Sequence, residues 1–220
     1  MKNLQVKSSI YALVIVSAIA WFTLAWLSAL DLSAATSFFS LIPKVVTCDL
    51  LLVLAFTKWG WKWNIFRGWL VPFPNLNGTW TGHIYSDWIN PETIKGVASI
   101  PVILTVHQSF FHINCKMMTG EMDSFSTSEG FNIDPERQIK QLAYIYTSKP
   151  RISLNQRSLP HDGAIVFDII EKPVRKLKGR YWTERKTIGE IILTHYSSNL
   201  LEDIPEELNQ HPVTEEKHIR

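Results

Sequence analysis

The sequence predicts an all-β, eight-stranded up-and-down barrel preceded by two transmembrane α-helices. Two long apolar segments occupy the first part of the chain. From residue 78 onward, short runs rich in Val, Ile, Thr and aromatic residues alternate with turn residues, as in successive β-strands. Several connections are only three or four residues long, and such connections favour neighbouring strands joined as hairpins.

The first apolar segment runs from Ser8 to Leu30 without a charged residue. At about 1.5 Å per residue it would extend roughly 35 Å, enough to cross a hydrocarbon core of about 30 Å. A cleaved signal peptide is the alternative, but its apolar region is typically only about 7–15 residues long. A second apolar segment, from about Phe38 to Phe56, follows at once and favours a pair of membrane helices.

The second apolar segment contains two charged residues, Lys44 and Asp49. They are five positions apart, roughly 140° around a helix of about 3.6 residues per turn, so they should not pair with each other. In one interpretation Lys44 extends to the membrane surface, while Asp49 is protonated or hydrogen-bonded to the first helix. In the other, Asp49 meets a polar group of a neighbouring protomer. We therefore predict that Lys44 and Asp49 act in the membrane or in oligomerisation.

Basic residues flank the helix pair on one side. Lys2 and Lys7 precede the first helix, Lys58 and Lys62 follow the second, and the short connecting loop carries no basic residue. The positive-inside rule therefore predicts a two-pass protein with both termini and the globular domain in the cytoplasm. Four tryptophans after the second helix are expected to form an aromatic belt at the inner membrane surface: Trp59, Trp61, Trp63 and Trp69.

These features divide the chain into four parts. We expect a membrane anchor in residues 1–70, a linker in 71–76 stiffened by Pro72 and Pro74, and a barrel in 77–197. Residues 198–220 are expected to be an acidic tail with at most one short helix. The eight expected strands lie near residues 78–87, 100–108, 111–118, 122–131, 141–148, 164–170, 177–183 and 188–196.

The first expected strand indicates how the barrel is closed. Trp80, Gly82 and Ile84 alternate on one face, so a large ring followed by a small residue would point into the barrel. The opening from Asn77 to Trp80 is similar to the Gly-x-Trp opening of lipocalins, in which the Trp closes the barrel base. This resemblance implies a lipocalin-like barrel and a structural role for Trp80.

Composition excludes several function classes. Formal net charge is +2 overall; residues 1–75 carry +4 and the remainder −2, so the globular part is not expected to bind a nucleic acid polymer. Cys48 and Cys115 are expected to be unpaired thiols, and no cysteine or histidine spacing indicates a metal site. Nucleotide-loop and nucleophile motifs are missing, so we expect neither an enzyme with catalytic residues nor a resident cofactor.

The strands carry a combination of residues suited to a nucleotide. Aromatic rings can stack on bases, while arginines and hydroxyls can hold phosphate. Residues 172–186 alone hold seven Lys/Arg against Glu184. Alternatively, the aromatic residues simply fill the barrel and the basic run is a solvated face near anionic lipid. The candidate ligand-binding residues are Ser126, Tyr144, Tyr146, Arg151, Arg180, Trp182, Arg185 and Thr187.

Several stretches, in this order and after two apolar segments, resemble the two-transmembrane, β-strand-rich effectors of bacterial CBASS anti-phage signalling. They are residues 76–82, the strand with Ser124, Ser126 and Ser128, and residues 142–146, 161–163 and 179–189. The resemblance implies an eight-stranded barrel that binds a cyclic dinucleotide made by a partner nucleotidyltransferase. It also implies a homo-oligomer formed on activation, which disrupts the bacterial inner membrane and stops infected cells from supporting phage.

Two other functions fit the same architecture. A membrane-tethered, lipocalin-like carrier of an apolar ligand would have a dry, uncharged lumen. A non-signalling membrane adaptor would bind protein and have a filled lumen.

Overall fold

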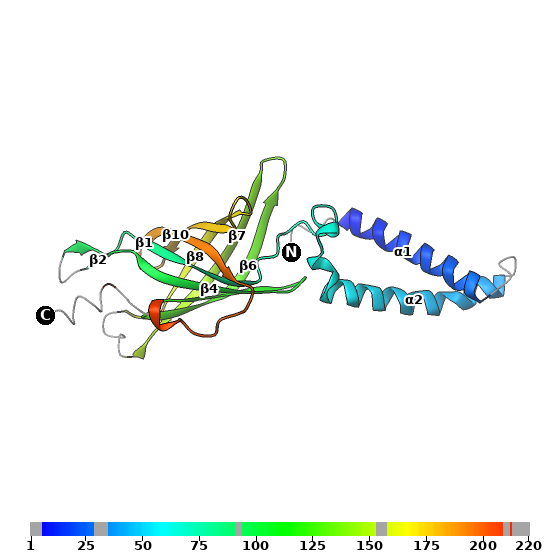
Figure 1. Cartoon of the computed structure of the whole chain (residues 1–220), viewed down its shortest axis with the longest axis horizontal. Helices are drawn as coiled ribbons and strands as arrows, with labels where there is room; N and C mark the ends of the chain where they lie inside the picture. The colour runs from blue at the N-terminus through cyan, green and yellow to red at the C-terminus, as the bar shows by residue number, and fades with distance from the viewer. Residues whose placement is uncertain (1–5, 29–34, 91–93, 153–157, 209–211, 213–220) are drawn as a thin grey trace. The chain divides into compact units, whose positions relative to one another are not determined.

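The computed structural model describes residues 6–28, 35–90, 94–152, 158–208 and 212 (Figure 1). The chain forms two compact units. The helical unit comprises residues up to Pro74 together with Ser109–Phe111, and the barrel unit comprises nearly all of the remainder. The loop expected around Asp31 and most of the expected tail beyond residue 208 lie outside the described residues.

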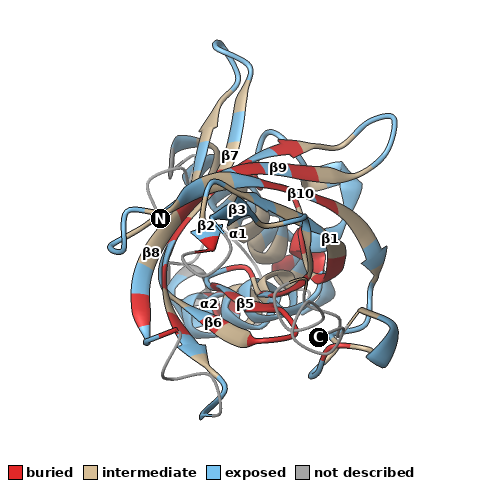
Figure 2. Cartoon of the chain, turned by 90° about the vertical axis from the view of Figure 1, so that its left-hand side faces the viewer, coloured by how far each residue is buried: buried red, intermediate tan, exposed pale blue. Residues whose placement is uncertain are grey.

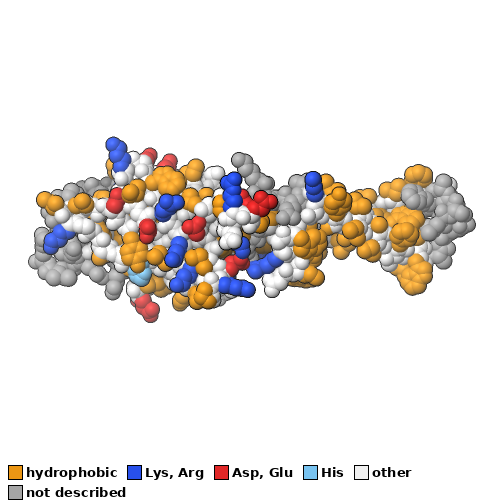
Figure 3. Space-filling view, turned by 90° about the horizontal axis from the view of Figure 1, so that it is seen from above, with side chains coloured by type: hydrophobic (Ala, Val, Ile, Leu, Met, Phe, Trp, Pro, Cys, Tyr) orange, Lys and Arg blue, Asp and Glu red, His pale blue; other side chains and the backbone are white. Residues whose placement is uncertain are grey.

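The helical unit contains the two expected apolar helices, α1 (Val6–Leu27) and α2 (Ala35–Lys58). Both are long and apolar enough to cross a membrane. Hydrophobic side chains cover this unit in Figure 3, whereas charged side chains gather on the barrel unit. The Ser17 hydroxyl on α1 donates a hydrogen bond of 2.7 Å to Oδ2 of Asp49 on α2. Asp49 thus has the partner on the first helix that one of our two interpretations required.

Two short 3₁₀ turns follow α2, η1 (Gly60–Lys62) and η2 (Asn64–Phe66). They fold the aromatic segment back on itself. Trp61 is buried and its ring lies 6.0 Å from that of Phe73. Trp59, Trp63 and Trp69 are exposed. Trp61 is therefore a packing residue of this unit, which corrects the expectation that all four tryptophans lie at a membrane surface.

The barrel unit confirms the predicted fold. Eight antiparallel strands close in the order β1-β10-β9-β8-β7-β6-β5-β4, with β1 pairing β4 (Figure 1). The strands are β1 (Gly78–Ser86), β4 (Ile100–Gln108), β5 (Ile113–Met118), β6 (Met122–Asp134), β7 (Ile139–Pro150), β8 (His161–Ile170), β9 (Lys176–Thr183) and β10 (Ile188–Ser197). The connection from β1 to β4 also contains a small hairpin that the sequence did not predict, β2 (Ile89–Asn90) and β3 (Lys95–Gly96).

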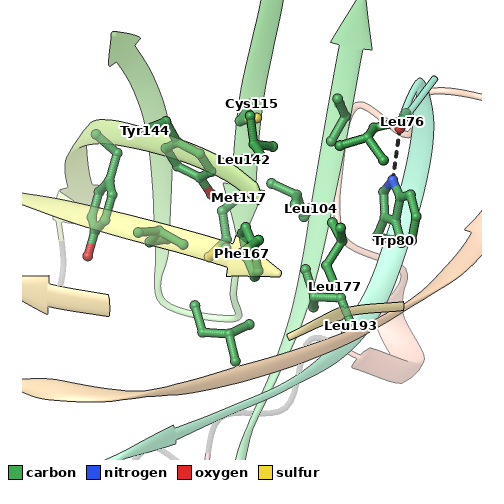
Figure 4. Packing of buried hydrophobic residues seen from close by; sticks show 14 of the residues in the cluster. Leu76, Trp80, Leu104, Cys115, Met117, Leu142, Tyr144, Phe167, Leu177 and Leu193 are labelled. Atoms are coloured by element: carbon green, nitrogen blue, oxygen red, sulfur yellow. Dashed lines mark hydrogen bonds between the residues drawn. The ribbon is translucent and has the colours of Figure 1, made fainter. Parts of the chain in front are cut away.

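Trp80 fills the end of the barrel at which β1 begins (Figure 4). Its ring is fully buried and its indole N–H donates to the Leu76 carbonyl at 2.9 Å. The Arg175 guanidinium lies 5.1 Å from the ring centroid and also donates to the Asn75 carbonyl at 2.6 Å. Leu104, Leu177 and Leu193 belong to the same buried cluster. An apolar plug with a satisfied indole therefore closes this end, as the Gly-x-Trp opening implied.

The segment after β10 packs on the outer wall. Ile204 is buried against Ile103 and Met118, which point outward from β4 and β5. Thr79 joins the segment to β1: its hydroxyl donates to the Asn199 carbonyl at 2.7 Å and accepts the Leu201 N–H at 3.1 Å. Residues 199–208 therefore form a strap on the barrel, which the acidic composition of the tail did not indicate.

Candidate functional site

The barrel contains a cavity at the end opposite Trp80. Figure 2 looks toward this end, which carries β2 and β3. The cavity and its open mouth together hold about 990 Å³ of space that no atom occupies, part of which is open to solvent. Two long connections, 88–99 and 149–163, contribute residues to its wall. The site therefore combines strand ends with the loops that join them.

Tyr146 and Tyr181 line the cavity, and each faces a glycine on the next strand. Tyr146 pairs with Gly163, and Tyr181 pairs with Gly189. A Cβ on Gly163 would lie 2.5 Å from the Tyr146 hydroxyl, and a Cβ on Gly189 would lie 2.6 Å from the Tyr181 ring. Each tyrosine ring therefore occupies the space left by a missing side chain, and the tyrosines line the lumen without filling it.

Arg185 supplies positive charge beside these tyrosines. It lies in the tight turn between β9 and β10, which is tied by a 2.7 Å hydrogen bond between the Thr183 and Thr187 hydroxyls. Its Nη1 donates to the Ser158 hydroxyl at 3.2 Å. Partial burial lowers the pKa of the guanidinium, against the opposing effect of Tyr146. An arginine remains charged under such a shift, so the turn presents a fixed cation to the cavity.

The tyrosine hydroxyls act as neutral donors. Burial raises the pKa of Tyr146, Tyr181 raises it further and the Arg185 guanidinium lowers it. All three residues line the cavity. Burial also raises the pKa of Tyr181, although a hydrogen bond with Ser86 opposes the shift. Protonated hydroxyls beside a guanidinium form a suitable seat for a phosphate oxygen.

His161 is neutral in this site. It is buried, and its Nδ1 lies 3.1 Å from the Leu159 carbonyl oxygen. Because a carbonyl only accepts, Nδ1 must carry the proton, which leaves Nε2 as an acceptor in the neutral ring. Burial lowers the pKa of His161 below its ordinary value, with a smaller opposing effect of the Leu159 hydrogen bond.

The remaining wall is mixed in character. The Ser124 and Ser148 hydroxyls lie 2.6 Å apart in a buried hydrogen bond. The buried residue Glu121 contributes the one acidic group among the described lining residues. The apolar and aromatic part of the wall comes from Ile84, Trp88, Val97, Ile100, Met117, Met122, Ile165 and Ile191.

The structure brings three of the eight expected ligand residues to the cavity: Tyr146, Arg185 and Thr187. Tyr146 comes from β7, whereas Arg185 and Thr187 share the turn between β9 and β10. They meet because β8 pairs with both β7 and β9. These three residues remain our candidates for ligand contact.

Two of the expected residues face away from the cavity. In β9, Leu177, Gly179 and Tyr181 are buried, so the alternate positions Arg180 and Trp182 lie outside and are exposed. The phase of the strand therefore corrects our placement of Arg180 and Trp182 beside the ligand. Tyr181, in the inner phase, lines the cavity instead.

Tyr144 is buried in the core rather than in the cavity wall. Its ring lies 6.3 Å from the ring of Tyr146. It also lies 6.2 Å from the ring of Phe167, and Figure 4 shows these two residues in the buried cluster. Burial raises its hydroxyl pKa well above the ordinary value. Tyr144 can therefore position Tyr146, but it does not line the site.

Ser126 and Arg151 are the remaining two expected residues outside the cavity wall. The Ser126 hydroxyl accepts the Cys115 N–H at 2.9 Å and donates to Glu129, so the barrel wall already uses it. Arg151 follows β7 and is exposed, and its backbone N–H donates to the Glu121 carbonyl at 3.0 Å. Neither is among the residues that line the cavity.

Sequence reasoning missed several residues of the wall. Tyr181 could have been found, because Lys178 and Arg180 alternate with it and indicate a solvent-facing phase. Ser158, His161 and Glu121 come from turns and strand ends that carry no alternation signal, so only the folded barrel shows that they meet.

The fold and the site together define a class of protein, a barrel that can receive a small ligand. Its cavity presents a cation and tyrosines, and the same chain carries two candidate membrane helices. The family model "Cap15, cyclic dinucleotide receptor domain" matches residues 71–195. The chain therefore belongs to the Cap15 cyclic dinucleotide receptor family. It is also 22% identical over 177 residues to "CD-NTase-associated protein 15" from Staphylococcus schleiferi, an alignment that covers 79% of this chain and 91% of the relative.

Proposed function

We propose that this protein is a membrane effector of anti-phage defence whose barrel binds a cyclic dinucleotide in the cavity beside Arg185. The observation that carries the proposal is the cluster of Arg185, Tyr146 and Tyr181 inside a barrel of the Cap15 receptor family. One ligand phosphate would lie against the guanidinium and the tyrosine hydroxyls. The aromatic and aliphatic wall would contact the bases.

Binding would favour an assembly of chains in the bacterial inner membrane. A ligand can shift this equilibrium only by its higher affinity for the assembled state. Within one chain, Oδ2 of Asp49 accepts from Ser17, while its buried Oδ1 has no hydrogen-bond partner among the residues described. In the assembly, the free oxygen of Asp49 would meet a polar group of the next protomer, with Lys44 near the membrane surface, and the packed helices would disrupt the bilayer.

The binding step is tested by titrating the full-length protein in detergent with cyclic dinucleotides. Arg185→Ala should weaken binding at least about tenfold, because a charged hydrogen bond contributes about 1.5–3 kcal/mol. Arg180→Ala is the matched control, because Arg180 is an exposed arginine on the outer face of the neighbouring strand. Equal losses in both variants would mean that Arg185 does not contact the ligand.

The same preparation separates the alternative functions. An apolar molecule that co-purifies with the chain and that cyclic dinucleotides do not displace would favour a carrier. Binding without a ligand-dependent increase in particle size would leave the receptor function intact and refute the assembly step.

A further inference from the structure

Four outward-facing apolar side chains form a row across the outer wall of the barrel, which we call the outer row. Pairing between neighbouring strands places them side by side on β10, β9, β8 and β7, in the order Ile188, Trp182, Ala164 and Ile145. Ile188, Ile145 and Trp182 are 56%, 51% and 48% exposed. A contiguous apolar patch of this kind on a protein surface often marks a contact with another molecule.

The outer row is the reverse side of the cavity wall. Successive side chains of a strand point to opposite faces, so each member of the row adjoins in sequence a residue that lines the cavity. These neighbours are Thr187, Tyr181, Ile165 and Tyr146. A ligand that immobilises them also fixes the strand ends that carry the outer row, which lowers the entropy cost of a contact made there.

The outer row is complementary to a second copy of itself. A two-fold axis parallel to the strands, between β8 and β9, reverses the order of the row. Trp182 of one chain then lies over Ala164 of the other, and Ile188 lies over Ile145. The largest side chain of the row thus meets the smallest, which suits the close packing of an interface core.

Two charges farther along the same strands obey the same symmetry. Lys178 on β9 pairs in register with Asp168 on β8, and both residues are exposed. They lie four positions from Trp182 and Ala164, respectively, on the same outer face. The axis that superimposes the rows places each lysine over the aspartate of the other chain, so the charges are complementary across the contact.

The small size of the outer row accounts for a need for ligand. A stable complex buries about 800 Å² on each partner, and four partly exposed side chains supply much less than this area. The row alone is therefore too small to hold two unliganded barrels together. It would add to the contacts that the membrane helices make.

We propose that the outer row is the surface through which a ligand-bound barrel contacts a second copy of this chain. The inference rests on the proposed function and names the barrel face that takes part in the assembly step. It also gives a role to Trp182, which lies outside the ligand cavity.

The first test measures particle size against chain concentration for the full-length protein in detergent. The probes, added separately, are cyclic di-GMP, cyclic GMP–AMP, cyclic di-AMP and cyclic di-UMP. With a probe that binds, Trp182→Ala should raise the concentration needed for assembly at least about tenfold, because a central tryptophan carries much of the binding energy of an interface. Affinity for the probe, measured below the assembly concentration, should be unchanged.

Tyr196→Ala is the matched control for this variant. Tyr196 is an exposed aromatic residue on β10 that lies outside the outer row. Its replacement should change the assembly concentration by less than about twofold, because the contact does not include it.

Charge reversal tests whether the contact joins two chains. Asp168→Lys and Lys178→Asp should each weaken assembly about fivefold or more, because each brings like charges together across the axis. An equimolar mixture of the two variants should assemble again, since the lysines of one chain then meet the aspartates of the other. A variant that is damaged in its own fold would not recover on mixing.

Two results would overturn the inference while leaving the receptor function intact. One is a Trp182→Ala variant that assembles like the wild type, including one that instead loses binding to anionic vesicles and so assigns the outer row to lipid. The other is a pair of charge variants that assemble normally when separate or fail to recover when mixed. A wild type that binds a probe without growing in size would refute the assembly step and this inference, whereas a wild type that binds no probe would refute the receptor function itself.

Discussion

Replacing Gly163 by alanine tests whether the shape of the cavity depends on a missing side chain. Gly163 lies on β8, opposite Tyr146 on β7. An added Cβ would lie 2.5 Å from the Tyr146 hydroxyl oxygen, 2.6 Å from Cζ of the same ring and 2.8 Å from the Trp182 carbonyl oxygen. Favourable carbon contacts begin at about 3.5 Å, so the ring has to retreat by about 1 Å.

The size of the effect follows from this overlap. Overpacking a well-filled site by one methyl group typically costs about 1–3 kcal/mol of folding stability. The backbone of the neighbouring strand limits movement on one side, so the Tyr146 ring should shift toward the lumen. A displaced donor and a narrower cavity should weaken binding of a cyclic dinucleotide by about tenfold, equivalent to about 1.4 kcal/mol.

Denaturant unfolding and ligand titration of the full-length protein measure the two effects separately. Gly130→Ala is the matched control on β6, because a Cβ there would meet no atom within 4 Å. It should change stability by no more than about 0.5 kcal/mol. In a Tyr146→Ala background, Gly163→Ala should have almost no further effect on affinity. The reasoning would be refuted by equal effects at Gly163 and Gly130, or by additive losses in the double variant.

Three further predictions concern pH, the helices and the strap. Because burial lowers the pKa of His161, the unfolded chain binds a proton more readily than the folded chain does. Folding stability should therefore fall as pH drops below about 6.5. Unfolding curves at pH 5 and 7.5 should show a smaller pH dependence for His161→Gln. Asp49→Ala should abolish toxicity in expressing cells without changing ligand affinity. Ser17→Ala should retain toxicity, because it removes only the hydrogen bond to Asp49, and hydrogen bonds between membrane helices average only about 0.6 kcal/mol. Full toxicity of the Asp49 variant would show that Asp49 has no part in the mechanism. Ile204→Asp should release the strap from the barrel and lower folding stability by about 1–3 kcal/mol. Unchanged protease resistance at residues 199–208 would contradict this prediction.

The sequence was sufficient for the architecture because the signals for it are local. Apolar length marks a membrane helix, and period-two alternation between turn residues marks a strand. All eight barrel strands lie within a few residues of their expected positions. The Gly-x-Trp opening also identified Trp80 as the plug of one barrel end, since a large ring beside a turn has few other places in a small barrel.

The site was predicted less well, for reasons that particular residues illustrate. Composition favoured Arg180 and Trp182 as ligand-binding residues. The alternation within β9, however, places both on the outer face of the barrel and Tyr181 on the inner face. In β6, a register shift between Ser126 and Ser128 interrupts the alternation, so three serines in one sequence phase do not share one face. A bulge of this kind depends on how two strands pair, and the sequence of one strand alone does not reveal it.

By itself, the sequence determined two apolar helices, eight strands, a plugged barrel end and a family resemblance. The tertiary structure decided which residues meet. Arg185 from one turn, Ser158 from a loop, Tyr146 from β7 and Glu121 from another turn share a cavity only because the sheet closes on itself. Closure brings strand ends that are distant in sequence to the same rim, and that arrangement depends on pairing register, which short-range alternation does not specify.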